Sequence, residues 1–76
     1  MYKKLSELKA GEKGIIFSNK AHNNIRRRLM DMGLIRGTSF TVVRKAPLGD
    51  PIEIRMNGFL LTLRIEEAEL VLVSLQ

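Results

Sequence analysis

Hydrophobic and polar positions alternate most clearly in the second half of the chain. Apolar side chains occupy every second position over residues 52–56 and again over residues 59–63, and Asn57-Gly58 separates the two runs. Alternation with period two predicts β-strands, and Asn-Gly supplies the two positive-φ positions of a type I′ turn. A two-residue turn places Met56 opposite Phe59, which puts the apolar side chains of both strands on one face. We therefore predict a hairpin with one buried face.

One segment, residues 24–32, has the spacing of an amphipathic helix, with Asn23 or Asn24 able to cap its free amides. Three apolar positions fall at i, i+4 and i+7 and share one face of this helix: Ile25, Leu29 and Met32. Gly33 follows where a left-handed residue ends a helix, and Leu34 can then pack back on the last turn. We expect Gly33→Val to destabilise the fold severely.

The remaining apolar runs are short and rich in β-branched residues, so they predict three more strands. They cover residues 13–17, 38–45 and 70–73. Two prolines make residues 47–51 a loop, because proline lacks the donor that a strand ladder needs. Residues 66–68 have the length of one helical turn. Together these elements predict a mostly-β fold: a small five-stranded SH3-like barrel with one short α-helix inserted between strands 1 and 2.

The bulk composition fits one small globular domain over residues 1–76. A chain of this size buries only about 60% of its unfolded surface, so nearly every apolar side chain is needed for the core. There is no cysteine, which removes disulfides and thiolate chemistry. No window approaches the roughly 18 apolar residues of a membrane span. We expect a cytoplasmic protein that does not insert into the membrane.

Candidate chemistry in the chain is sparse. His22 is the only histidine and has no second nitrogen or sulfur ligand nearby, and no nucleophile, base and orienting group occur together. The acidic cluster Glu66, Glu67 and Glu69 is interpreted as a solvated turn rather than a cation site. We therefore expect no enzyme activity, no cofactor and no metal site, and no tight stoichiometric binding of ferrous iron.

Two blocks of the sequence resemble the FeoA family, ferrous iron transport protein A. They are residues 26–34, which read RRRLMDMGL, and residues 46–54, which read APLGDPIEI. The resemblance covers almost the whole chain and implies an SH3-like fold. It also implies a cytoplasmic accessory role in ferrous iron uptake, in which the domain binds the cytoplasmic GTP-binding part of the membrane transporter FeoB and supports or regulates transport.

Charge and exposure suggest where a partner would bind. The chain has 13 basic and 8 acidic residues, a net charge of +5, which favours acidic partners. The candidate contact residues come from the helix, the loop and the hairpin: Arg26, Arg27, Arg28, Met30, Leu48, Gly49, Asp50 and Leu60. The simpler interpretation of the arginines is a solvated face in which Arg27 or Arg28 pairs with Asp31.

A different class of function is left open by the same charge: a nucleic-acid-binding or transcription-associated module. The four aromatic residues provide few stacking platforms for bases, which makes nucleic acid the less favoured partner. Self-association through apolar edges is also left open.

Overall fold

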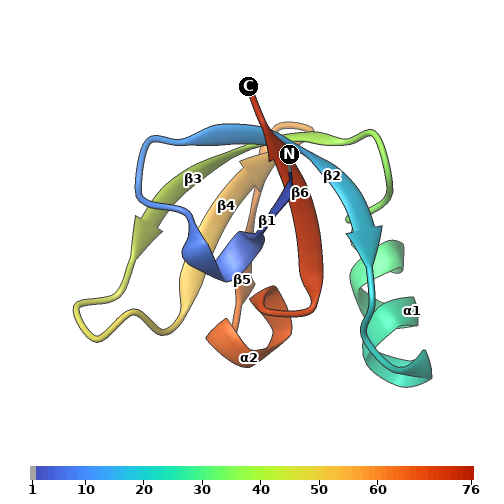
Figure 1. The fold of residues 1–76 in the computed structure, drawn as a ribbon. Helices are drawn as coiled ribbons and strands as arrows, with labels where there is room; N and C mark the ends of the chain where they lie inside the picture. The colour runs from blue at the N-terminus through green and yellow to red at the C-terminus, as the bar shows by residue number, and fades with distance from the viewer. Residues whose placement is uncertain (1) are drawn as a thin grey trace.

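The computed structural model describes residues 2–76 and consists of one antiparallel sheet, two α-helices and a short 3-10 helix (Figure 1). The strands are β1 Tyr2–Lys4, β2 Lys13–Asn19, β3 Ser39–Lys45, β4 Ile52–Met56, β5 Phe59–Leu63 and β6 Val71–Leu75. The helices are η1 Leu5–Glu7, α1 Asn23–Asp31 and α2 Ile65–Ala68. The sheet order is β1-β6-β2-β3-β4-β5.

The predicted hairpin is confirmed in both register and turn chemistry. Met56 pairs with Phe59, and Ile52 pairs with Leu63 at the other end of the ladder. Asn57 and Gly58 have φ values of 51° and 82°, as a type I′ turn requires. Local turn chemistry and alternation therefore fixed this part of the fold.

The predicted count of five strands is wrong, because the structure has a sixth strand at the N-terminus. β1 pairs antiparallel with β6, with Lys3 opposite Val73. All three residues of β1 are exposed, so no alternation of buried and polar side chains marks this strand in the sequence. Its strand character comes from backbone pairing with an element about 70 residues away in the chain, which is a long-range contact.

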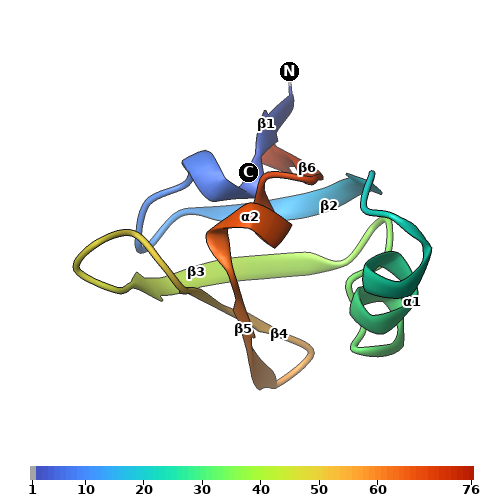
Figure 2. The same cartoon turned by 90° about the horizontal axis from the view of Figure 1, so that it is seen from below.

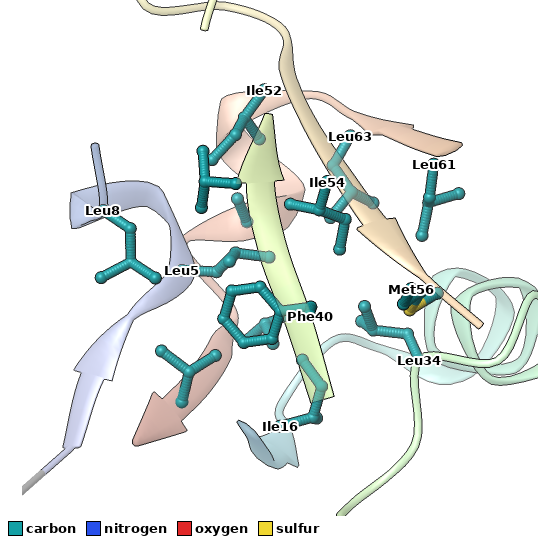
Figure 3. Packing of buried hydrophobic residues seen from close by; sticks show 14 of the residues in the cluster. Leu5, Leu8, Ile16, Leu34, Phe40, Ile52, Ile54, Met56, Leu61 and Leu63 are labelled. Carbon is teal, nitrogen blue, oxygen red and sulfur yellow. The ribbon is translucent and has the colours of Figure 1, made fainter. Parts of the chain in front are cut away.

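The core lies on the inner side of the curved sheet and draws on every strand from β2 to β6 (Figure 3). Leu5 and Leu8 from the η1 region are also fully buried. The close-up shows Phe40 of β3 near the middle of this cluster. Two leucines in the first eight residues thus complete the packing of the sheet, and the opening segment is part of the domain.

The end of α1 has the hydrogen bonding that its sequence predicted. Gly33 has a φ of 98°. The N–H of Leu34 donates to the carbonyl oxygen of Leu29 at 2.9 Å, and the N–H of Gly33 donates to that of Met30 at 2.9 Å. These two bonds define a Schellman motif, and Leu29 and Leu34 are both fully buried in the same core cluster.

The start and the buried face of α1 differ from the prediction. His22 occupies the N-cap position, and no side-chain hydrogen bond caps the helix. Ile25 is 36% exposed, while Leu29 is the residue of α1 that is buried. The helix lies beyond the end of β2, beside the sheet (Figures 1 and 2), so only a narrow stripe of it can reach the core.

Candidate functional site

The outer face of α1 carries two exposed arginines next to an exposed methionine. Arg26, Arg27 and Met30 are exposed and line one shallow hollow of about 380 Å³. Within residues 2–76 the ion pairs are Arg28 with Glu67 and Arg44 with Glu53, so Arg26 and Arg27 have no acidic partner. The structure therefore brings three of the predicted contact residues together on one surface, which we call the α1 face.

Arg28 belongs to a different environment. Its guanidinium pairs with the carboxylate of Glu67 on α2. The carboxylate also accepts a hydrogen bond from the N–H of Arg64 at 3.1 Å. Glu67 is only 7% exposed, so its interpretation as part of a solvated turn is wrong. The predicted pairing of the arginines with Asp31 does not occur among the described ion pairs.

This ion pair lies in a groove of about 460 Å³ between α1 and the end of β5, the β5–α1 groove. Asp50 and Pro51 from the β3–β4 loop line the same groove. The carboxylate of Asp50 accepts a hydrogen bond from the N–H of Ile65, the first residue of α2, at 2.9 Å. Asp50 thus holds the start of α2, a structural role that the sequence prediction did not include.

The remaining loop and hairpin candidates lie outside these hollows. Leu48 is 97% exposed at the tip of the β3–β4 loop, and Gly49 beside it has a φ of 87°. The yellow tip of the β3–β4 loop lies on the side of the molecule away from α1 in both views (Figures 1 and 2), whereas the end of the loop at Asp50 and Pro51 lines the β5–α1 groove. Leu60 is 50% exposed on β5, next to Arg55 in the ladder. The predicted residues therefore form at least two separate surfaces.

A third hollow, the β2–α1 groove, contains residues that sequence reasoning missed. It measures about 280 Å³, and its walls come from the end of β2, from α1 and from the turn before β3. The lining includes Phe17, Ser18, Asn19 and Arg36 together with Arg26 and Met30. No periodic signal marks these positions, because they are brought together only when α1 folds against β2.

Metal and membrane features are limited in the described structure. Residues 2–76 contain no group of three or more His, Cys, Asp or Glu side chains placed to hold a metal ion. Neither α-helix in this range has the length and apolar character of a membrane-spanning segment. The fold and its surface define a small mostly-β domain with a basic helix beside one antiparallel sheet, beyond the end of β2.

The chain belongs to the FeoA family, since the FeoA domain model matches residues 3–75. It is 36% identical over 72 residues to the Fe(2+) transport protein A/Fe(2+) transporter FeoB fusion protein of Porphyromonas gingivalis, covering 95% of this chain and 8% of the fusion protein. The family is one of ferrous iron transport.

Solved structures agree with this assignment. The solution structure of the FeoA protein from Chlorobium tepidum is 55% identical and superposes with a TM-score of 0.91, over 96% of this chain and 70% of that one. The zinc complex of Stenotrophomonas maltophilia FeoA, described as an SH3 domain protein, is 33% identical with a TM-score of 0.79, over 97% and 89% of the two chains. The SH3-like description thus comes from a relative with a similar fold.

Proposed function

We propose that this chain is a cytoplasmic accessory protein of ferrous iron uptake that binds the cytoplasmic GTP-binding part of a FeoB-type transporter. The observation that carries the proposal is the Porphyromonas gingivalis fusion, in which a region 36% identical to this chain is joined to FeoB in one polypeptide. Two functions that are fused in one organism and separate in another commonly act together, so association with a separate transporter is the corresponding arrangement here.

The α1 face is the contact surface that we favour. Arg26 and Arg27 carry charges that no described acidic side chain neutralises. Met30 beside them is 44% exposed, and a flexible thioether adapts to the shape of a partner. A positively charged patch around an exposed apolar side chain suits an acidic protein surface, because charge steers the encounter and apolar contact holds the complex.

A binding measurement with membranes that contain the cognate transporter tests the proposal, in the presence and absence of guanine nucleotide. The Arg26→Gln/Arg27→Gln variant is expected to associate about tenfold more slowly at low salt, since exposed charges act mainly on the association rate. Lys9→Gln/Lys13→Gln is the matched control: it removes the same charge from exposed positions at the other end of β2.

Other outcomes would redirect the assignment. If the wild-type protein failed to bind the transporter in either nucleotide state, the proposal would be wrong. If it bound unrelated DNA or RNA sequences with an affinity that falls steeply with salt, a nucleic-acid-binding role would replace it. Leu48→Asp and Leu60→Asp probe the other two candidate surfaces: a faster dissociation in either variant would move the contact away from α1.

A further inference from the structure

The β2–α1 groove contains two polar atoms that have no hydrogen-bond partner within the described structure. They are the hydroxyl oxygen of Ser18 and the amide nitrogen of Asn19, both shielded from solvent. The other end of the Asn19 side chain is occupied, because its carbonyl oxygen accepts from the N–H of Ala21 at 3.0 Å. Buried polar atoms in proteins are nearly always hydrogen-bonded, so two residues that line one groove and each keep an unsatisfied donor suggest a missing ligand.

An irregularity in β2 explains how these side chains reach the groove. The ladder with β6 pairs Ile16 with Val73 and then Ser18 with Leu72, so Phe17 is an extra residue on the β2 side. A bulge of this kind changes the direction of the side chains that follow it. Ser18 and Asn19 therefore lie next to α1 through a local departure from regular pairing, of the type that often accompanies binding sites.

The charge around the groove is positive. Arg26 from α1 and Arg36 from the turn before β3 both line it, and no acidic residue is among the described residues that do so. Neither arginine takes part in an ion pair with residues 2–76. Two guanidinium groups that line one groove give it a positive potential, which attracts an anion. A negatively charged group is thus the ligand that suits both the unsatisfied donors and the charge of the groove.

The remaining walls are apolar and held in place. The ring of Phe17 stacks on Tyr2 with 3.9 Å between the ring centroids, and the guanidinium carbon of Arg36 lies 4.8 Å from the Phe17 centroid. The exposed side chain of Met30 lines the groove from α1. An apolar side chain next to the negative group would find a complementary surface here.

We propose that the β2–α1 groove binds a glutamate or aspartate side chain of an acidic partner segment, with a neighbouring apolar residue against Phe17 and Met30. The inference deepens the proposed function and relies on it only for the identity of the partner. A peptide carboxylate fits better than a free phosphate, since phosphate sites typically use consecutive backbone N–H groups, whereas the donors here are side chains beside apolar walls.

An NMR titration of the full chain tests this inference without the transporter. The probe is a short blocked peptide of glutamates with a central leucine, and the same peptide with glutamine in place of glutamate is its control. Inorganic phosphate is the third arm. With the acidic peptide we expect amide shifts centred on Ser18, Asn19, Arg26 and Arg36. We expect no such shifts with the glutamine peptide and weaker ones with phosphate.

Three variants distinguish specific binding in the groove from nonspecific electrostatic attraction of the acidic peptide. Ser18→Ala is expected to leave thermal unfolding unchanged or slightly raised, since its hydroxyl has no partner to lose, and to weaken peptide binding several-fold. Arg36→Gln is expected to weaken it about tenfold, the size of a lost hydrogen bond to a charged group. Arg27→Gln removes the same charge from the same region without lining this groove and is expected to change affinity least.

The outcomes distinguish this inference from the proposed function. Equal losses in Arg27→Gln and Arg36→Gln, with no effect of Ser18→Ala, would mean diffuse attraction and overturn the site. If phosphate bound as tightly as the acidic peptide, the choice of a peptide ligand would be wrong. If no probe caused localised shifts, the groove would hold only water and the inference would be wrong. Peptide binding at this groove in a protein that does not bind the transporter would refute the proposed partner and support the site.

Discussion

Gly33 offers a quantitative test of how α1 is held to the sheet. Its φ of 98° lies in the region that side-chain-bearing residues rarely adopt, which for alanine costs about 1–2 kcal/mol. A methyl group built on Gly33 would meet Asn57, Met56 and Phe59 at 3.5, 3.7 and 3.8 Å, ordinary van der Waals distances. For Gly33→Ala the cost is therefore conformational, with no steric contribution.

Valine adds a second effect at the same position. Its two further methyl groups extend beyond the Cβ toward the tip of the β4–β5 hairpin, where Met56 and Phe59 are already in contact range. Overpacking of this kind costs about 1–3 kcal/mol, so Gly33→Val should lose about 2–5 kcal/mol of unfolding free energy in total. In a domain of this length, a loss of 1 kcal/mol lowers the midpoint of thermal unfolding by about 4–8 °C.

Gly11 supplies the control, because it has nearly the same φ, 92°, and no atom within 4 Å of an added Cβ. Thermal and urea unfolding of alanine and valine variants at both positions would be compared by circular dichroism. Alanine should destabilise both positions similarly, and valine should cost distinctly more at Gly33 than at Gly11. If Gly33→Val unfolded at the wild-type temperature, or if both valine variants lost the same stability, the contact between the end of α1 and the hairpin would not carry the energy assigned to it.

The other predictions concern packing, charge and iron. Gly14→Ala should abolish cooperative unfolding or lower its midpoint strongly. A Cβ at this position would lie 2.6 Å from the carbonyl oxygen of Ser74, which is a backbone atom and cannot move aside as a flexible side chain could. Arg28→Gln should cost about 1–2 kcal/mol in urea unfolding, since it leaves the carboxylate of Glu67 with one backbone donor. Arg27→Gln should stay within about 0.5 kcal/mol, as exposed unpaired charges do. Anaerobic calorimetry should detect no ferrous iron site of micromolar or tighter affinity, because residues 2–76 hold no group of three metal-ligating side chains; a stoichiometric site would contradict this prediction.

The features that could be predicted from the sequence are those decided within a few residues. Asn57-Gly58 and the alternation on either side of it fixed the hairpin register, since the turn geometry and the buried face agree on one pairing. Gly33 followed by Leu34 fixed the end of α1 for a similar reason: the hydrogen bonds of a Schellman motif close within the last turn.

Only the tertiary structure decided which side of α1 faces the sheet and what each charge meets. Arg28 and Glu67 are 39 residues apart in the chain, and no local pattern could show that they pair or that Glu67 is buried. Ile25 has helical spacing like Leu29 but remains exposed, because a helix beyond the end of β2 buries only a narrow stripe. The β2–α1 groove depends on a bulge at Phe17 and on where α1 docks. Such features arise from packing between segments distant in sequence, whose energy depends on the whole fold and not on any one segment.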